Sequence, residues 1–315
     1  MPDIVFMGTP DFAVPSMAYL LKAGINISLL VCQPDRKKGR GQKLQFPPTK
    51  QFALDHQIEV FQPDSVRTPA VIEKLREKRP QFCVVIAYGK ILPKEILDLP
   101  QKACVNVHGS LLPHWRGAAP IQFALLNGDS ETGVCTMLMD EGMDSGDLLL
   151  TRSTSIDPNE CVDSLTERLK VMGAELIVET IKTFDQIQPV QQDHEQATYA
   201  RLLKKEDRWI RWDEDATAVY NRYRALSPTP GVLTEFRGKR LLLKSMEIAA
   251  LAGGTPPETP GTILTADKAG VAVACGKGAI SILSCQPENK KPVSSADWIN
   301  GHQVKTGEIL GGAAP

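Results

Sequence analysis

The densest cluster of reactive side chains in this sequence is the run Asn-Val-His-Gly-Ser-Leu-Leu-Pro, 106–113. Asn106 and His108 are two residues apart, and on a strand such residues point to the same face. An amide beside an imidazole can stabilise an oxygen that gains negative charge at a tetrahedral centre. The alternative is a histidine whose hydrogen bonds are satisfied in a turn at the end of the strand. These residues leave both interpretations open.

A second cluster, 139–147, contains three aspartates and two glycines and predicts a tight loop. A carboxylate of this loop could face the imidazole of His108, stabilise its protonated form and fix its orientation. The alternative is a solvated acidic turn, which this segment by itself favours. A metal-binding loop is disfavoured because the spacing does not match an EF-hand and no second histidine lies nearby, so no metal is expected.

A third feature is a basic run in which five of the eight residues from 36 to 43 are cationic, with glycines between them. The net charge of the chain is −1, so nucleic-acid binding would depend on a local patch of this kind. A mobile loop here could place cations along a phosphate backbone without reading its sequence. A solvated surface loop is the alternative. The basic residues are Arg36, Lys37, Lys38, Arg40 and Lys43.

The elements that must position these residues follow from the hydrophobic pattern. Over the first half, apolar runs at 4–7, 27–31, 82–87, 103–107 and 133–139 alternate with helical patterns at 12–23, 49–56, 69–78 and 161–184. This alternation predicts an α/β domain with a Rossmann-like, mostly parallel sheet, whose site lies beyond the carboxyl ends of the strands. Short strand candidates after residue 206 predict a small β-barrel. The expected domains are 1–189 and 206–315, joined by a linker at 190–205.

Several classes of protein are disfavoured. The first turn, Gly8-Thr9-Pro10, lacks the G-x-G-x-x-G pattern, and Pro10 removes a backbone N–H that would help to bind a phosphate, which argues against an NAD-dependent enzyme. The seven cysteines are scattered and form no C-x-x-C pair, so neither a zinc ribbon nor a disulfide framework is expected. With no signal peptide or membrane span expected, the predicted location is the reducing cytoplasm.

Longer motifs resemble one known family. The run Asn-Val-His-Gly-Ser-Leu-Leu-Pro-x-x-Arg-Gly-Ala-Ala-Pro-Ile-Gln, followed by Met-Asp-x-Gly-Met-Asp-x-Gly, is similar to methionyl-tRNA formyltransferases. The opening Phe-Met-Gly-Thr-Pro-Asp-Phe-Ala-Val-Pro, the Gln-Pro-Asp-Arg before the basic run and the Ala-Tyr-Gly-Lys-Ile-Leu-Pro at 87–93 resemble the same family. The likeness covers essentially the whole chain.

The resemblance implies a role for each matching position. Asn106, His108 and Asp144 correspond to catalytic residues. The folate site would be lined by Ser110, Leu111, Leu112 and Pro113, with Ala87, Tyr88, Gly89 and Asp140 in loops that hold the pteridine chiefly through backbone groups. The basic run would approach the acceptor end of tRNA, with Arg40 at its centre, and the C-terminal barrel would resemble an oligonucleotide-binding (OB) fold. The implied co-substrate is 10-formyltetrahydrofolate, the implied partner is initiator methionyl-tRNA, and a monomer is expected.

Related enzymes that share this catalytic half leave the acceptor open at this stage. Some formylate an amino sugar nucleotide or glycinamide ribonucleotide, and others hydrolyse or oxidise the formyl folate. The basic run and the barrel favour tRNA. A tRNA-binding module without activity is a further alternative, which the presence of Asn106, His108 and Asp144 disfavours.

Overall fold

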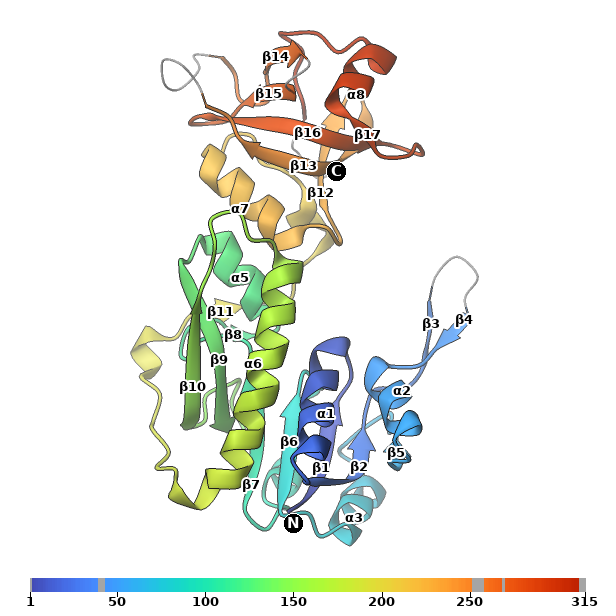
Figure 1. The fold of residues 1–315 in the computed structure, drawn as a ribbon, viewed down its shortest axis with the longest axis vertical. Helices are drawn as coiled ribbons and strands as arrows, with labels where there is room; N and C mark the ends of the chain where they lie inside the picture. The colour runs from blue at the N-terminus through green and yellow to red at the C-terminus, as the bar shows by residue number, and fades with distance from the viewer. Residues whose placement is uncertain (1, 39–42, 251–257, 268–269, 312–315) are drawn as a thin grey trace. The chain divides into compact units, whose positions relative to one another are not determined.

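The computed structural model describes residues 2–38, 43–250, 258–267 and 270–311 (Figure 1). The chain forms two compact units. Unit 1 combines residues 1–120, 131–155 and 166–201, and unit 2 combines residues 121–130, 156–165 and 202–315. The domain limits expected from the sequence stay a prediction. Within the described ranges, every helix is too short or too polar to cross a membrane.

Unit 1 is built on a sheet with the strand order β10-β9-β7-β6-β1-β2-β5. The strands from β7 to β5 run parallel. At one edge β9 runs antiparallel to β7, and β10 runs antiparallel to β9. The predicted Rossmann-like, mostly parallel sheet is therefore confirmed. The strands are β1 (Asp3–Gly8), β2 (Asn26–Val31), β5 (Val60–Phe61), β6 (Phe82–Ile86), β7 (Ala103–His108), β9 (Glu131–Leu138) and β10 (Leu148–Ser155).

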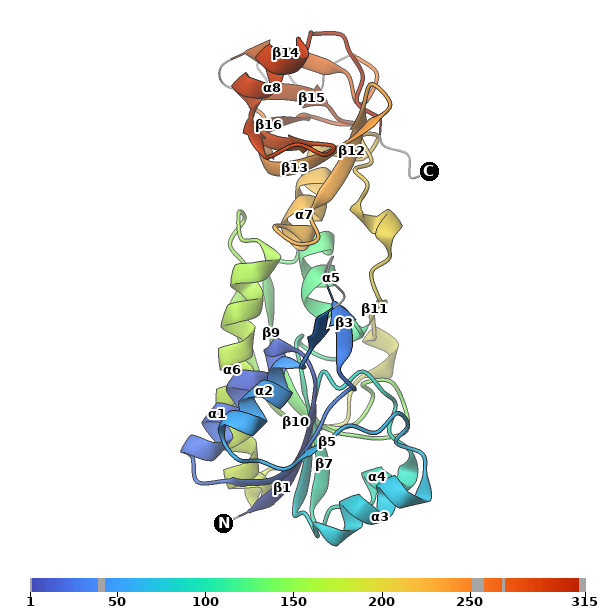
Figure 2. The ribbon, with the colours of Figure 1, turned by 90° about the vertical axis from the view of Figure 1, so that its right-hand side faces the viewer.

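Helices cover both faces of this sheet (Figure 2). Along β1, Ile4 and Phe6 belong to one hydrophobic core, and Val5 and Met7 belong to the other. A strand buried on both faces needs apolar residues at every position, which explains the unbroken run that identified β1 in the sequence. The first core packs against α1 (Val14–Lys22), α2 (Pro48–Asp55) and α6 (Val162–Thr183), and the second against α3 (Pro69–Glu77) and α4 (Lys94–Leu97).

The strand order reverses at β1, which lies between β2 and β6. Ligands of open α/β sheets bind in the crevice at the carboxyl ends of strands near such a point. A Cβ at Gly8, the last residue of β1, would lie only 2.8 Å from the carbonyl oxygen of Ile86, the last residue of β6. Strands β1 and β6 therefore approach each other closely at this point. The loop after β6 and the end of β7, which carries His108, lie at the same edge.

Unit 2 carries an antiparallel sheet in the order β12-β13-β16-β15-β14, with β17 on β16. Residues 307–311 bond to both outer strands: Gly311 exchanges two backbone hydrogen bonds with Glu235, and Ile263 bonds to residues 307 and 308. The sheet is therefore closed into the predicted small barrel; its likeness to an OB fold stays a prediction. Its elements are α5 (Pro120–Asn127), α7 (Ala216–Leu226), β12 (Val232–Phe236), β13 (Lys239–Ile248), β14 (Ile263–Asp267), β15 (Gly270–Ala274), β16 (Ala279–Pro287), β17 (Val293–Ser294) and α8 (Ser295–His302).

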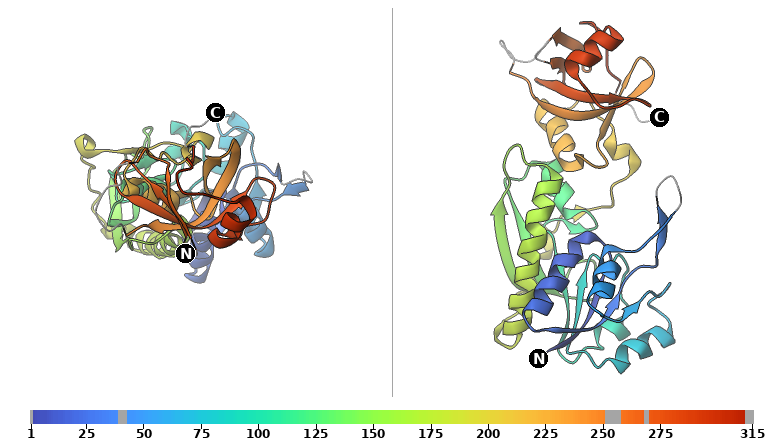
Figure 3. Two further views of the ribbon diagram at one scale, coloured as in Figure 1. Left: turned by 90° about the horizontal axis from the view of Figure 1, so that it is seen from above. Right: turned by 45° about the vertical axis from the view of Figure 1, so that its right-hand side comes forward.

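The basic run differs from its prediction as a loop. Its described parts, β3 (Arg36–Lys38) and β4 (Lys43–Gln45), pair antiparallel and stand out from the body of unit 1 beside α2 (Figure 3). A ladder of backbone hydrogen bonds does not require apolar side chains, so charge did not prevent strand pairing. Arg40 lies outside the described residues. The remaining short elements are β8 (Arg116–Gly117), β11 (Tyr199–Ala200) and the 3-10 helices η1 (Asp11–Ala13), η2 (Phe184–Gln186), η3 (His194–Gln196) and η4 (Lys205–Arg208).

We expect Gly261→Ala to destabilise unit 2 more than Gly238→Ala. Both glycines have positive φ, 92° and 74°, so alanine carries about 1–2 kcal/mol of backbone strain at either position. A Cβ at residue 261 would also lie 2.5 Å from the Leu310 carbonyl oxygen in the closing segment, whereas one at residue 238 meets no described atom within 4 Å. The additional loss of unfolding free energy at residue 261 should be at least about 1 kcal/mol.

Denaturant unfolding followed by tryptophan fluorescence measures this difference, because Trp209, Trp212 and Trp298 report on unit 2. Equal losses in the two variants would contradict the expectation that the close approach of Leu310 to Gly261 excludes a side chain there.

Candidate active site

His108 is the last residue of β7, and its side chain is buried. Its Nε2 lies 3.0 Å from the carbonyl oxygen of Trp115. A carbonyl oxygen can only accept a hydrogen bond, so Nε2 carries a proton and donates it. The other ring nitrogen, Nδ1, is therefore the one that can bind or release a proton during a reaction.

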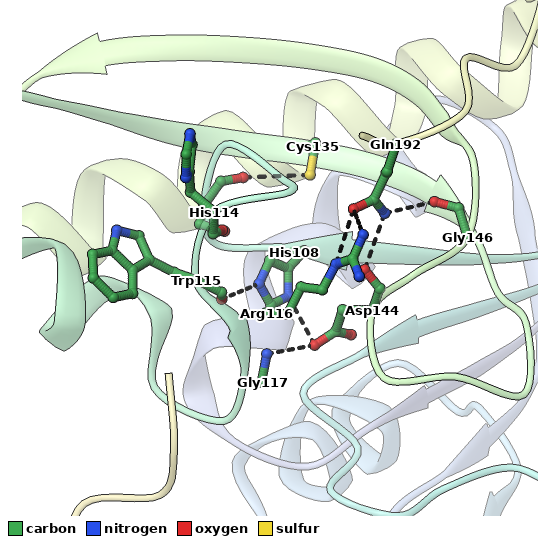
Figure 4. A network of polar contacts seen from close by, with 10 residues as sticks. His108, His114, Trp115, Arg116, Gly117, Cys135, Asp144, Gly146 and Gln192 are labelled. Carbon is green, nitrogen blue, oxygen red and sulfur yellow. Dashed lines mark hydrogen bonds and ion pairs between the residues drawn. The ribbon is translucent and has the colours of Figure 1, made fainter. Parts of the chain in front are cut away.

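The carboxylate of Asp144 faces this Nδ1 (Figure 4). The distance from Oδ2 to Nδ1 is 3.8 Å, which is too long for a direct hydrogen bond but close enough for an ion pair when the imidazole is protonated. The same Oδ2 accepts a hydrogen bond of 2.8 Å from the backbone N–H of Gly117. The structure thus brings together an imidazole and a carboxylate that lie in two separate motifs of the sequence.

The backbone from 115 to 117 contacts both of these side chains, and an adjacent segment holds it in place. Trp115 has a φ of 62°, and its N–H donates to Oγ1 of Thr198 at 2.8 Å. The N–H of Arg116 donates to the Thr198 carbonyl oxygen at 2.9 Å, and β8 pairs in parallel with β11. At Gly117, a Cβ would lie 2.7 Å from the Ala200 carbonyl oxygen, so this close approach needs glycine.

Asn106 lies two residues before His108 on β7 and is half-buried. Its Oδ1 is buried, yet no described residue donates a hydrogen bond to it. An unsatisfied buried oxygen costs about 1–3 kcal/mol, so such atoms in native structures require an explanation. A hydrogen-bond donor that arrives with a substrate would supply one.

The loop after β6 presents its backbone. Ala87 and Gly89 are exposed and have positive φ values of 48° and 81°. The side chain of Tyr88 between them points into the core, where burial raises the pKa of its hydroxyl to about 12. Its carbonyl oxygen accepts a hydrogen bond from Gln33 at 3.1 Å. The exposed backbone of residues 87 and 89 is therefore what this loop offers to a ligand.

The remaining residues predicted to line a folate site shape the neighbouring turns. Ser110 is fully buried, and its Oγ donates to the His114 carbonyl oxygen at 2.6 Å. Leu112 packs in a small buried cluster on β9, and a Cβ at Gly133 of that strand would lie 2.6 Å from Leu111. The Pro113 carbonyl oxygen accepts a backbone hydrogen bond from residue 198. Folate contacts by residues 110–113 stay a prediction.

Asp140 folds the loop that carries Asp144. It is exposed, and its Oδ1 accepts hydrogen bonds from the Gly142 N–H at 3.0 Å and from the Ser145 hydroxyl at 2.9 Å. These bonds tie the two ends of the acidic loop together. A contact between Asp140 and a pteridine stays a prediction.

A polar network anchors the hairpin of the basic run. Asp35, directly before β3, pairs with Lys50 at 2.7 Å and accepts a hydrogen bond from Gln62 at 2.8 Å. The bonds from Lys50 and Gln62 hold the pKa of the Asp35 carboxyl below its usual value. Gln62 also donates to the Gln33 carbonyl oxygen, and Gln33 donates to that of Tyr88. The base of the hairpin is thus linked to the loop after β6.

Cys104 precedes Asn106 by two residues on β7, so the alternation of the strand places it on the same face as Asn106 and His108. It is buried in the second core, and the neighbouring Cys83 together with burial raises the pKa of its thiol well above the usual value. A buried thiol that resists ionisation is a poor nucleophile, so Cys104 packs in the core and is not a candidate for catalysis.

Sequence reasoning missed two buried residues behind Asp144, namely Arg116 and Gln192. They bond to each other, and Gln192 also bonds to the acidic loop. Arg116 lies in the long run at 106–122 that resembles the family, but the resemblance implied no role for this residue. Gln192 lies in the polar stretch predicted as a linker, where nothing in the sequence distinguishes it from neighbouring glutamines.

Comparison with known proteins identifies the family. Residues 3–181 match the family described as formyl transferase, and residues 202–303 match that of the formyl transferase C-terminal domain. The methionyl-tRNA formyltransferase of Trichlorobacter lovleyi is 47% identical over 98% of this chain and 96% of its own length. That of Acetivibrio thermocellus is 44% identical over 98% of this chain and 99% of its own length. The chain belongs to the methionyl-tRNA formyltransferase family.

Solved structures with low sequence identity share the fold of this family member. WlaRD, a sugar 3N-formyl transferase, gives a TM-score of 0.65 at 18% identity, covering 92% of this chain and 99% of that one. HypX from Aquifex aeolicus, solved in complex with tetrahydrofolic acid, gives a TM-score of 0.60 at 16% identity, covering 98% of this chain and 48% of that one. At these identities the likeness concerns the fold.

The hydrogen bonds of two histidines predict opposite neutral tautomers. His108 Nε2 faces a carbonyl oxygen, so neutral His108 should carry its proton on Nε2. His56 is the control: its Nδ1 lies 2.9 Å from the Phe52 carbonyl oxygen, so neutral His56 should carry its proton on Nδ1. Imidazole ¹⁵N chemical shifts distinguish the two forms. A proton on Nδ1 of neutral His108 would contradict the geometry described for the site.

Proposed function

We propose that this chain transfers the formyl group of 10-formyltetrahydrofolate to the α-amino group of methionyl-initiator tRNA, giving N-formylmethionyl-tRNA for translation initiation. Membership of the family along nearly the whole chain supports the acceptor and the reaction class. The observation that carries the chemistry is the convergence of His108 Nδ1 and Asp144 beside Asn106 at the end of β7.

The residues present suit a formyl folate. HypX was solved with tetrahydrofolic acid, and WlaRD in the presence of 5-N-formyl-tetrahydrofolate. In this chain, the exposed backbone of Ala87 and Gly89 can hydrogen-bond a flat heterocycle, as can the loop that contains Asp140. The turn containing Ser110, Leu111, Leu112 and Pro113 completes the proposed folate site. The bound folate supplies a formyl group whose carbonyl carbon is electrophilic.

The proposed mechanism uses three side chains and no covalent enzyme intermediate. A bond forms between the amine nitrogen and the formyl carbon, the bond from that carbon to N10 breaks, and the proton lost by the amine is matched by one gained at N10. Asn106 and protonated His108 donate hydrogen bonds to the formyl oxygen as it gains negative charge, each worth about 3–4 kcal/mol. Asp144 stabilises the imidazolium. The unpartnered Oδ1 of Asn106 can accept a hydrogen bond from the incoming amine.

For the tRNA we propose the hairpin of the basic run and the barrel of unit 2 as binding elements. The cations Arg36, Lys37, Lys38, Arg40 and Lys43 would contact phosphates near the acceptor end, and phosphate contacts position a nucleic acid without specifying its sequence. The anchoring of the hairpin base through Asp35 and Lys50 supports this role, because a fixed base limits where those cations can reach. The OB-like barrel would follow the nucleic-acid backbone.

The relatives of this fold include sugar formyltransferases, so the acceptor needs a direct test. The purified chain is supplied with 10-formyltetrahydrofolate and one of four acceptors: methionyl-initiator tRNA, the same tRNA uncharged, an amino sugar nucleotide or glycinamide ribonucleotide. Formylation of the charged tRNA, with none of the others, supports the proposal. Formylation of a small acceptor in preference to the tRNA would replace it, and binding of tRNA without transfer would indicate an inactive binding module.

We also propose that the protein acts as a cytoplasmic monomer. The support for the compartment is that all seven cysteines are free thiols and six of them are buried, as expected in a reducing environment.

Asn106→Ala and His108→Ala should each depress kcat about 10²–10³-fold while changing the affinity for charged tRNA little. Each variant removes a hydrogen bond that strengthens as charge develops on the formyl oxygen, so the transition state loses more than the ground state. Steady-state kinetics and a tRNA binding assay measure the two effects. Equal losses in turnover and in tRNA affinity would contradict the assigned roles.

Neutralising the basic run should weaken the use of charged tRNA and leave folate binding intact. Replacing Arg36, Lys37, Lys38 and Lys43 by glutamine removes up to four phosphate contacts, and each lost contact lowers the slope of log K against log salt by about 1. Replacing four exposed cations elsewhere in unit 1 by glutamine is the control, because it removes the same amount of charge: Lys22, Arg76, Arg79 and Lys182. A collapse of folate affinity in the first variant would show that the hairpin has a structural role instead.

A further inference from the structure

Gln192 follows α6 in the chain, in the polar stretch predicted as a linker, yet the residue is only 4% exposed. Its Nε2 donates hydrogen bonds to two carbonyl oxygens of the acidic loop, that of Asp144 at 3.0 Å and that of Gly146 at 2.6 Å. Its Oε1 accepts from Nε and Nη2 of Arg116 at 3.1 and 2.7 Å (Figure 4). Both ends of this buried amide are therefore in use, and one end holds the backbone of Asp144.

Arg116 is the second member of this pair and is 3% exposed. Its neighbours in the chain, Trp115 and Gly117, are the residues whose backbone bonds to His108 and to the Asp144 carboxylate. Its side chain reaches the backbone of Asp144 through Gln192. Residues 116 and 117 therefore hold Asp144 in two ways: Gly117 bonds to its carboxylate directly, and the Arg116 side chain holds its backbone through Gln192. Nη2 of Arg116 also lies 3.0 Å from Nδ1 of His194.

Asp144 needs such support because its backbone has a φ of 51°, a left-handed conformation that is uncommon for a residue with a side chain. Conformations of this kind persist where surrounding contacts determine them. The two hydrogen bonds from Gln192 fix the carbonyl oxygen of Asp144 itself and that of Gly146, two residues later. A loop released from these bonds can move its carboxylate away from His108, and a misplacement of about 1 Å at a reacting group can cost about 10²-fold in rate.

We propose that Gln192, itself held by Arg116, is a positioning residue of the transfer reaction, which keeps the Asp144 carboxylate facing His108 Nδ1. The segment that carries it is therefore part of the active-site structure. Gln192 contacts neither the substrate nor the reacting atoms and acts through Asp144, so the inference rests on the role proposed for Asp144 in formyl transfer.

Gln192→Glu is the informative variant. The new carboxylate still accepts both hydrogen bonds from Arg116, but it places an oxygen where the amide N–H group donates to the carbonyl oxygens of Asp144 and Gly146. Gln191→Glu is the matched control, because it makes the same chemical change one residue earlier at an exposed side chain. We expect kcat of Gln192→Glu to fall about 10–100-fold, with KM for both substrates within about 3-fold, and Gln191→Glu to match the wild type.

A double-mutant cycle separates positioning from general destabilisation. In the background of Asp144→Asn, whose side chain carries no charge to position, the same Gln192→Glu change should cost no more than about 3-fold in kcat, because residues that act as a unit are not additive. A full loss that persists in this background would overturn the proposal, as would an unchanged kcat of the single variant. If Gln192→Glu does not fold, Arg116→Lys takes its place in the cycle. Lysine keeps the positive charge but cannot donate the two hydrogen bonds that Arg116 makes to Gln192. The same outcomes support or overturn the proposal.

A measurement without substrate keeps this inference separate from the proposed function. The Gly117 amide donates to the Asp144 carboxylate, so its hydrogen exchange should become about 10-fold faster in Gln192→Glu and stay unchanged in Gln191→Glu. Unchanged exchange in Gln192→Glu would overturn the positioning role whether or not the wild-type chain transfers formyl groups. Faster exchange in a chain that transfers none would contradict the proposed function and leave the positioning geometry supported.

Discussion

The hydrogen bond from His108 Nε2 to the Trp115 carbonyl oxygen decides which nitrogen of the imidazole can take part in chemistry. With Nε2 committed as a donor, a proton can be gained or lost only at Nδ1, and this nitrogen faces the Asp144 carboxylate. Two residues further on, the Gly117 N–H bonds to that carboxylate. A short stretch of backbone therefore orients both side chains, and the electrostatics of the site depend on its conformation.

The fold supplies this arrangement from segments far apart in the chain. Asn106 and His108 come from the end of the parallel strand β7, and Asp144 comes from the loop before the edge strand β10. The support for residues 115–117 comes from β11, which follows α6 in the chain and pairs with β8. Because these contacts are made on folding, hydrogen-bond donors need little reorganisation when charge develops at a bound formyl group. Preorganisation of this kind is how a protein lowers the barrier of acyl transfer without a metal or a covalent intermediate.

The sequence allowed the sheet and the side chains of the candidate site to be predicted, but not the contacts that align them. Strand β1 is apolar at each position because both faces are buried, so the pattern was unambiguous. Strand β10 was not predicted, because it lies at the sheet edge and alternates with polar residues such as Thr151 and Ser153. The burial of Gln192 depends on Arg116, 76 residues away in the chain, and no local pattern records such a contact. The basic run was predicted as a loop because it is rich in charge and glycine, but its described parts pair as the strands β3 and β4.

The charge of Asp144 is the quantity on which the whole account depends, and it can be removed with little change of shape. Asparagine tolerates the left-handed backbone of residue 144, and its amide oxygen can still accept from Gly117. The decisive measurement is the single-turnover rate of formyl transfer to methionyl-initiator tRNA by Asp144→Asn with both substrates saturating. The account predicts a rate about 10²–10⁴-fold below that of the wild type. A rate within about 3-fold of the wild type would contradict it.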